Sequence, residues 1–361
     1  ATLERFLQYV KTWTTSNQNN ADAGITPSTD IQADFATTLE TELKKIGVTD
    51  VEVTKHAYVC ARLSATKGLE KAPSIGFLAH MDTVPEVSGK DVNPQVIKNY
   101  DGSVLTLKEG IVLNPEKDTA LAEAIGDTII TTDGTTLLGA DDKAGIAEIM
   151  TGIEYILKNN IPHGNVEIIF SPDEETGHGM DKVPREWIQS KLCYTLDGGH
   201  IGELEVECFT AWKSEITFNG ISKHTGTARP DMVNAVTMAA SFINLLPQNE
   251  SPEATDGYLG FYAPMEIKGH IEQSQVLLYL RDFTNDAMNK RLKTVEVLAK
   301  AMEYKFPGSS VEVVHTKQYL NMKEEMDKTP DVVSTLIEAA KNIGIEPLFK
   351  PIRGGTDGSR L

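Results

Sequence analysis

The sequence predicts an α/β catalytic domain, with a mixed, mostly parallel sheet flanked by helices, and a smaller ferredoxin-like α+β domain inserted into it. Three short apolar runs each stop on acidic residues or a histidine, and a fourth segment carries two adjacent carboxylates to the start of a helix. Between residues 211 and 314 the pattern becomes strand, helix, strand, strand, helix, strand, which is the order of a ferredoxin-like sandwich. We expect a catalytic domain of residues 1–209 and 317–361 and an inserted domain of residues 210–316.

The N-terminal part of the chain alternates helices with strands. Residues 2–14 carry apolar side chains on one helical face, and a second helix is expected over 28–46, where short polar side chains can cap its start. Residues 51–53 and 58–63 have the alternation and β-branching of strands. Residues 86–126 are rich in turns, so we expect an insertion near the mouth of the site.

The later elements follow the same signals. The expected strands and helices are a strand at 211–219, a helix at 232–246, strands at 261–271 and 276–283, a helix at 285–304, a strand at 311–314 and a helix at 331–343.

Composition limits the classes of function. The chain has 361 residues, of which 40% are hydrophobic, so it can bury a large core and more than one domain. Its formal net charge of −18 argues against nucleic acid and against an anionic membrane as partners. Three cysteines without paired spacing, no span-length apolar run and no signal-peptide profile together predict a cytoplasmic protein.

Four segments deliver polar residues to one region of the predicted sheet. Three are strands, and the fourth is a small-residue loop that leads into a helix whose apolar positions run from Ile146 to Leu157. The polar residues at these ends are His80, Asp82, Asp141, Asp142, Asp173, Glu174, Glu175 and Asp197. Because ligands bind outside the carboxyl ends of strands in α/β sheets, we expect these side chains to converge.

Converging carboxylates would repel one another and take up protons unless cations bind among them. Two divalent ions about 3.5–4 Å apart are the usual solution in hydrolases that activate water and polarise a carbonyl. The mixture of histidine and carboxylates suits zinc, with Co²⁺ or Mn²⁺ as substitutes. Taken alone, Asp141 and Asp142 would be helix caps, and spacing does not decide which of them, or which of Glu174 and Glu175, binds metal.

Six motifs, in this order, resemble the tripeptide aminopeptidases of the dinuclear zinc peptidase family, which also includes carboxypeptidase G and aminoacylase. The resemblance spans nearly the whole chain. The motifs are His80-Met81-Asp82, GADDKAG at 139–145, DEETG at 173–177, DGG at 197–199, GISKH at 220–224 and RGGTDG at 353–358.

The resemblance implies two Zn²⁺ per subunit and assigns their ligands. His80 and Asp197 would bind the first ion, Glu175 the second, and Asp141 would bridge the two. Asp142 is then left as a candidate helix cap.

The resemblance also implies a reaction, in which zinc-activated water releases the N-terminal residue from small peptide substrates. Glu174 would be the general base, and Asp82 would orient the site. His224 would donate to the developing oxyanion from the inserted domain, which in the family acts as a lid and dimerisation domain, so we expect a homodimer. Arg281 and Arg353 are candidates for binding the free carboxylate of a tripeptide, with structural salt bridges as the alternative.

One departure concerns the second metal. The family supplies a further histidine from a segment after the glycine-rich loop at 353–358, so we expect the natural protein to continue beyond Leu361. The competing interpretations are a dipeptidase or N-acyl amino acid amidohydrolase of the same family, and a catalytically silent homologue that binds peptides or metal.

Overall fold

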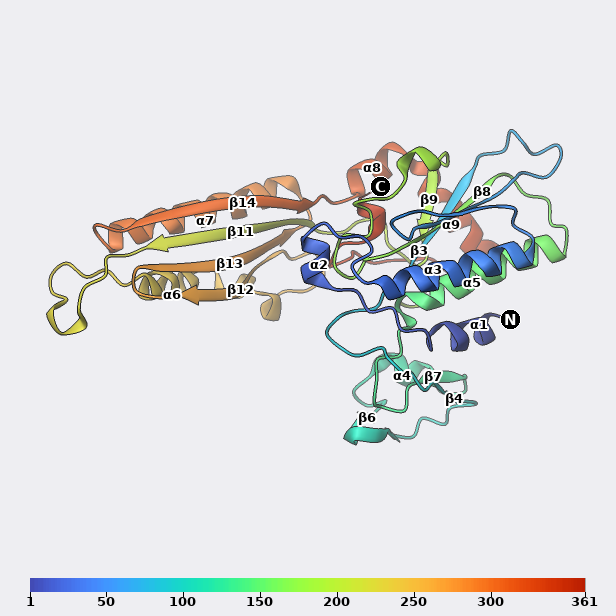
Figure 1. Cartoon of the computed structure of the whole chain (residues 1–361), viewed down its shortest axis with the longest axis horizontal. Helices are drawn as coiled ribbons and strands as arrows, with labels where there is room; N and C mark the ends of the chain where they lie inside the picture. Colours follow the sequence, from blue (N-terminus) through green and yellow to red (C-terminus); the bar gives the residue numbers. More distant parts are fainter. Residues whose placement is uncertain (361) are drawn as a thin grey trace. The chain divides into compact units, whose positions relative to one another are not determined.

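The computed structural model describes residues 1–360, which form two compact units, residues 1–199 and residues 200–360 (Figure 1). Each unit has its own hydrophobic core. The sequence predicts different boundaries, in which residues 317–361 belong to the catalytic domain together with residues 1–209. These boundaries stay a prediction.

The first unit is built on a five-stranded sheet with the order β1-β2-β8-β3-β9. Strand β2 is antiparallel to both of its neighbours, whereas β8, β3 and β9 are mutually parallel. Within this sheet β1, β8, β3 and β9 therefore run in one direction, which confirms the predicted mixed, mostly parallel sheet. The strands are β1 (Asp50–Val53), β2 (Val59–Leu63), β3 (Ile75–His80), β8 (Val166–Ser171) and β9 (Leu192–Thr195).

Two helices, α3 (Asp30–Ile46) and α5 (Ala140–Lys158), pack against this sheet, and α1 (Thr2–Tyr9) packs against α5. Helix α3 contacts β1 and β2, and α5 contacts β3, so that apolar residues of both helices join the sheet in one core (Figure 1). Helix α3 ends where Gly47 adopts a left-handed conformation with φ of 108°.

Helix α1 is shorter than the predicted helix over 2–14. Beyond its end the backbone turns aside, because the carbonyl oxygen of Thr12 accepts a hydrogen bond from Lys143 and that of Thr14 accepts one from the N–H of Thr83. Contacts of Thr12 and Thr14 with distant residues thus take the place of the last helical turn.

The turn-rich segment forms a small group of short elements apart from the main sheet (Figure 1). Strand β4 pairs with β7, and β5 pairs with β6. The short elements of this unit are α2 (Gln18–Asp22), β4 (Gln95–Ile97), β5 (Leu105–Thr106), β6 (Val112–Leu113), α4 (Thr119–Glu123) and β7 (Ile129–Thr131).

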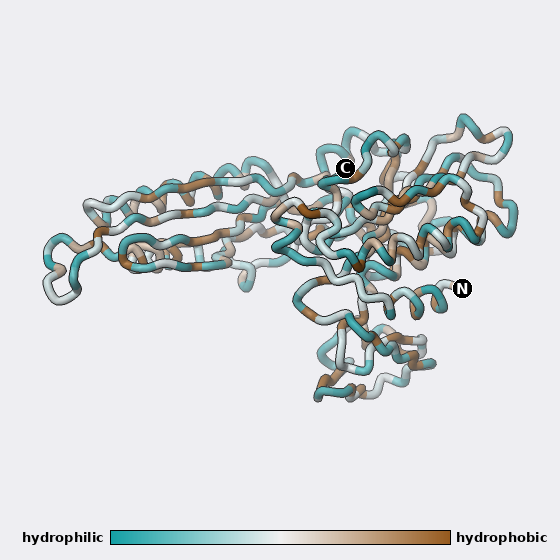
Figure 2. The backbone as a smooth tube through the Cα atoms, in the orientation of Figure 1, coloured by the Kyte–Doolittle hydropathy of each residue, from teal (hydrophilic) through white to brown (hydrophobic). Residues whose placement is uncertain are grey.

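The second unit is built on an antiparallel sheet with the order β12-β13-β11-β14, and α6 and α7 lie together on one face of it (Figure 1). Hydrophobic and hydrophilic residues alternate along these strands, as a sheet covered on one face requires (Figure 2). The predicted ferredoxin-like order is present. Its elements are β11 (Thr210–Asn219), α6 (Ala235–Leu245), β12 (Phe261–Gly269), β13 (Gln273–Asp282), α7 (Asn285–Lys305) and β14 (Ser310–Tyr319).

Strand β14 is longer than the predicted strand over 311–314. It pairs with nearly all of β11, from Asn219 opposite Ser310 to Ala211 opposite Tyr319, so a long neighbouring strand extends it beyond the segment that its own sequence predicts. The rest of this unit contains β10 (Glu203–Leu204), α8 (Lys323–Lys328), α9 (Pro330–Asn342) and β15 (Leu348–Phe349). Over residues 1–360, the helices lack the combination of length and apolar character that crossing a membrane needs.

Candidate metal centre

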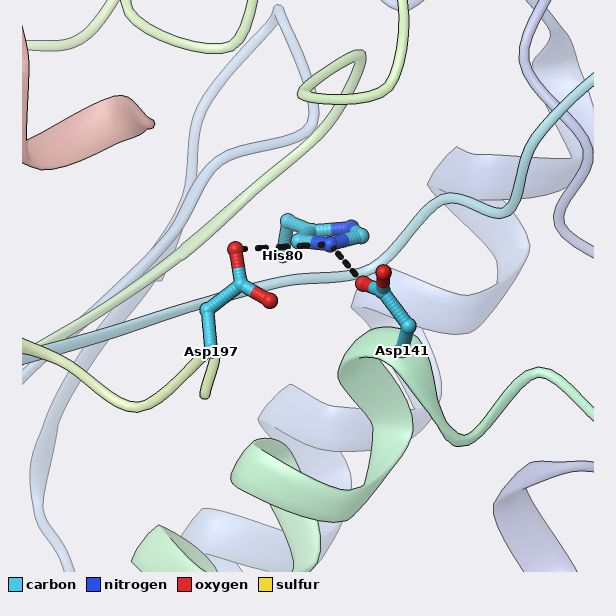
Figure 3. A group of neighbouring side chains, drawn as sticks. All are labelled: His80, Asp141 and Asp197. Carbon is cyan, nitrogen blue, oxygen red and sulfur yellow. Dashed lines mark hydrogen bonds and ion pairs between the residues drawn. The ribbon is translucent and has the colours of Figure 1, made fainter. Parts of the chain in front are cut away.

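His80, the last residue of β3, is the centre of a cluster of carboxylates. Its ring is buried, and its Nε2 lies 2.7 Å from Oδ1 of Asp141 and 3.9 Å from Oδ2 of Asp197 (Figure 3). One atom of each of these three side chains falls within 4.8 Å of the others, which is close enough to share one metal ion. Three of the predicted ligands are therefore brought together from β3, the start of α5 and the segment after β9.

Asp82 lies fully buried behind this cluster. Its Oδ1 is 3.3 Å from Nδ1 of His80, which also lies 3.1 Å from the Asp82 carbonyl oxygen. The two carboxylate oxygens accept hydrogen bonds from the N–H groups of Glu174 and Glu175, at 2.9 and 3.2 Å. One buried carboxylate thus orients the imidazole and holds the backbone of the acidic turn, as partners behind metal ligands commonly do.

Asp141 and Asp142, which spacing alone could not separate, take different positions. Asp142 is buried, and its oxygens accept hydrogen bonds from the N–H of His80 at 3.0 Å and from the N–H of Gly145 at 3.2 Å. This is a cap contact, which agrees with the role left for Asp142, whereas the Asp141 carboxylate faces His80.

The electrostatics of the cluster favour a cation. Burial, reinforced by the charges of Asp141, Asp82 and Asp197, raises the pKa of Glu175 to about 7. Burial likewise raises the pKa of Asp197. For His80 burial opposes the charged ring, but hydrogen bonds to Asp141 and Asp82 hold its pKa well above its usual range. One imidazole nitrogen among crowded carboxylate oxygens is a donor set that fits zinc.

Asp173, which the sequence predicted to join the cluster, instead turns its carboxylate toward residues before and within α3. Asp173 is fully buried, and its oxygens accept hydrogen bonds from Ser28 and Gln32 near the start of α3. The apolar run before Asp173 indicated that a strand ends there, but no local signal connects it to residues so distant in the sequence.

Two further residues of α5 support the site. Lys143 is buried, with Nζ 2.6 Å from the carbonyl oxygen of Thr12. Burial lowers its pKa to about 8. Gly145 lies so close to the residue that follows β9 that an added Cβ would lie 1.9 Å from the carbonyl oxygen of Leu196.

The three substrate-binding candidates all lie in the second unit. His224 is exposed, and its Nδ1 accepts a hydrogen bond from the N–H of Gly226 at 3.1 Å. The guanidinium of Arg281 donates to the carbonyl oxygens of Trp212 and Leu280.

Arg353 makes several hydrogen bonds to backbone and hydroxyl oxygens and contacts two aromatic rings. Its guanidinium donates to the carbonyl oxygens of Gly257 and Leu259, at 2.9 and 2.7 Å, and to both oxygens of Thr255. It also lies over the rings of Phe209 and Phe261.

Comparison with known proteins gives consistent relatives. Residues 132–361, more than half of the chain, match the Peptidase family M20/M25/M40. Peptidase T of Bacillus licheniformis is 46% identical over 362 residues, covering 99% of this chain and 87% of the relative. Peptidase T of Caldanaerobacter subterraneus subsp. tengcongensis is also 46% identical, covering 99% of this chain and 88% of the relative.

Solved structures agree. The aminopeptidase PepT from Bacillus cereus superposes with a TM-score of 0.73 at 25% identity, covering 99% of this chain and 86% of that one. The YxeP protein of Bacillus subtilis, a dinuclear metal-binding peptidase, has the same fold, with a TM-score of 0.62 at 12% identity, covering 99% and 84%. The expected resemblance to the dinuclear peptidases is confirmed, and this chain, a hydrolase of the metallopeptidase class, belongs to the Peptidase family M20/M25/M40.

Proposed function

We propose that this peptidase is a zinc-dependent aminopeptidase that releases the N-terminal residue from tripeptides. The observation that carries the proposal is the convergence of His80, Asp141 and Asp197 on one point, beside the turn that bears Glu174 and Glu175. Its relatives at 46% identity are named Peptidase T, and the aminopeptidase PepT has the same fold.

In this proposal two Zn²⁺ are held by four side chains. His80 and Asp197 would hold the first ion, Glu175 would hold the second, and Asp141 would be shared by both. When bound, such a pair of ions lowers the pKa of water and polarises the carbonyl of the scissile bond. The raised pKa of Glu175 supports this assignment, since a cation would relieve the repulsion among the carboxylates.

Glu174 moves the proton. It takes one from the attacking water as the new C–O bond forms, and it returns that proton to the leaving amine as the C–N bond breaks. The turn that bears Glu174 is anchored by Asp82, so the base and the neighbouring Glu175 keep a fixed relation.

His224 is proposed to donate a hydrogen bond to the developing oxyanion. Its Nδ1 already accepts the N–H of Gly226, so in a neutral ring the proton sits on Nε2. Nε2 is then the free donor that oxyanion stabilisation requires.

Arg281 and Arg353 are proposed to recognise the C-terminal carboxylate and so to measure peptide length. Backbone carbonyl oxygens hold both guanidinium groups in place. The two Nη groups of Arg353 already donate to four oxygen atoms, so a peptide carboxylate would take the place of one or more of these acceptors.

We further propose that the protein works in the cytoplasm as a homodimer. Two of its free cysteines, Cys60 and Cys208, are buried, which suits a reducing compartment. The edge strands β12 and β14 expose Ile267 and Val314, and such edges need cover. Sedimentation velocity at micromolar protein should give a dimer, and a monomer alone would contradict this state.

The experiment that tests the activity compares peptides of one composition and different length. The zinc-loaded protein should hydrolyse a tripeptide with kcat/KM well above that for the matching dipeptide and tetrapeptide, and only the N-terminal residue should be released. Preference for the dipeptide or for an N-acyl amino acid would assign the site to a different activity. Binding without turnover would indicate a silent homologue.

A further inference from the structure

The turn that carries Glu174 and Glu175 is held from two sides by buried carboxylates. On one side Asp82 accepts the N–H groups of both residues. On the other side Asp173, which precedes them, is tied to residues 28 and 32 near the start of α3. The proposed reaction uses Asp82 but gives no part to Asp173, although both side chains are fully buried.

The contacts of Asp173 form a complete network. Its two oxygens accept the N–H of Ser28 at 3.0 and 2.8 Å, and Oδ1 also accepts the Ser28 hydroxyl at 2.5 Å and Nε2 of Gln32 at 2.7 Å. The amide oxygen of Gln32 in turn accepts the N–H of Asp173 at 3.1 Å. Ser28 and Gln32 are themselves 2% and 0% exposed, so water does not compete for these bonds.

The network holds a backbone conformation that L residues rarely adopt. Asp173 has φ of 60°, in the left-handed region, where the backbone of a residue other than glycine must be stabilised by its surroundings. The Asp173 carbonyl oxygen is fixed as well, by the hydroxyl of Thr176 at 2.9 Å and the N–H of His178 at 3.0 Å. A change of conformation at this residue would re-aim the two residues that follow it.

We propose that Asp173 is a positioning residue, which through Ser28 and Gln32 fixes the turn that presents Glu174 to water and Glu175 to the second metal ion. This inference rests on the proposed function of those two glutamates. Asparagine would keep the shape of Asp173, but its amide nitrogen would face a donor in either orientation, the N–H of Ser28 at the Oδ2 position or Nε2 of Gln32 at the Oδ1 position. The network could then no longer be fully satisfied.

The test uses Asp173→Asn together with a compensating change. In the double variant Asp173→Asn, Gln32→Glu, the new amide at position 173 can donate to the new carboxylate at position 32 and to the Ser28 hydroxyl. Gln32→Glu alone brings two carboxylates together where Nε2 and Oδ1 now lie 2.7 Å apart. Asp34→Asn, the same change at an exposed position of α3, is the matched control.

Three readouts separate positioning from general structural damage. Asp173→Asn should lower kcat at least tenfold with KM within about twofold, weaken zinc affinity in chelator competition several-fold, and speed hydrogen exchange of the 171–178 peptide. The double variant should recover kcat to within about threefold of the unaltered protein, and Asp34→Asn should change none of the three. Should Asp173→Asn not fold, Ser28→Ala should give a smaller effect on the same readouts.

Two results would overturn the inference: a folded Asp173→Asn variant with unaltered kcat and exchange, or a folded double variant no more active than Asp173→Asn. Glu174→Gln serves as the separate control for the proposed function. If that variant keeps its turnover, the base assignment falls, whereas the exchange of the 171–178 peptide still reports on Asp173.

Discussion

At the scale of single residues, the site depends on buried carboxylates that bind backbone groups. Asp82 accepts the N–H groups of Glu174 and Glu175 and lies 3.3 Å from Nδ1 of His80. Because Nδ1 of His80 is occupied in this way, Nε2 is directed toward Asp141.

Replacing Glu174 by glutamine tests the proton acceptor. The change keeps the shape of the side chain but removes its basicity, so kcat should fall by roughly 10²–10⁴-fold while zinc content and peptide affinity stay close to those of the unaltered protein. Steady-state kinetics and metal analysis of the purified variant measure both. Near-normal kcat would show that another group accepts the proton.

Replacing Arg353 by methionine tests recognition of the peptide carboxylate. KM for tripeptides should rise, with a loss of binding free energy on the order of the 2–5 kcal/mol that breaking a buried charge pair costs. KM for a C-terminally amidated tripeptide, already a poor substrate, should barely change. Arg281→Met is the parallel variant.

Because Arg353 also donates to Gly257, Leu259 and Thr255, thermal unfolding of Arg353→Met must be measured beside its kinetics. Equal hydrolysis of the amide and the free acid by the unaltered enzyme would show that no carboxylate clamp exists.

At the scale of elements, the start of α5 places two metal-site segments against each other. Gly145→Ala should lower stability by about 1–3 kcal/mol, the usual range for overpacking, because its Cβ would lie 1.9 Å from the Leu196 carbonyl oxygen beside Asp197. Zinc affinity should fall with it. Gly152→Ala, in the same helix with no atom within 4 Å of the added Cβ, should instead be neutral or stabilising. Equal behaviour of the two variants in calorimetry would contradict this packing.

The sequence predicted elements best where the local pattern and tertiary contacts agree. The ferredoxin-like order, the end of β3 at His80 and the end of β8 at Ser171 follow from apolar runs and turn residues. Helix α1 is shorter than predicted, because Lys143 donates a hydrogen bond to the carbonyl oxygen of Thr12. Strand β14 is longer than predicted, because it pairs along β11.

At the site, residue chemistry indicated a cluster, but the pattern could not separate Asp141 from Asp142. They differ because Asp142 accepts hydrogen bonds from the N–H groups of His80 and Gly145, and Asp141 does not. The Asp173 network was also beyond prediction, since its partners are in another part of the chain.

At the scale of the whole molecule, metal removal should make stability depend on pH in a defined direction. In the metal-free protein the pKa of Glu175 is about 7, against an ordinary value of 4.5. A carboxyl group with a raised folded pKa stabilises the fold below its unfolded pKa, and that contribution is lost as pH rises through the folded pKa. The unfolding temperature of the chelated protein should therefore drop further below that of the zinc-loaded protein as pH rises from about 4.5 to about 7.

Glu175→Gln isolates this group. The chelated variant should lose less stability over the same pH range than the chelated unaltered protein. An identical pH dependence of the two, measured by calorimetry, would show that Glu175 is not the titrating carboxyl group.

The central claim is that residues of the first unit form a two-metal centre, and anomalous diffraction at the zinc edge from zinc-loaded crystals tests it most directly. We expect two peaks about 3.5–4 Å apart, with His80 and Asp197 on one, Glu175 on the other and Asp141 between them. The absence of a peak at His80, or peaks that none of these four side chains contacts, would contradict it.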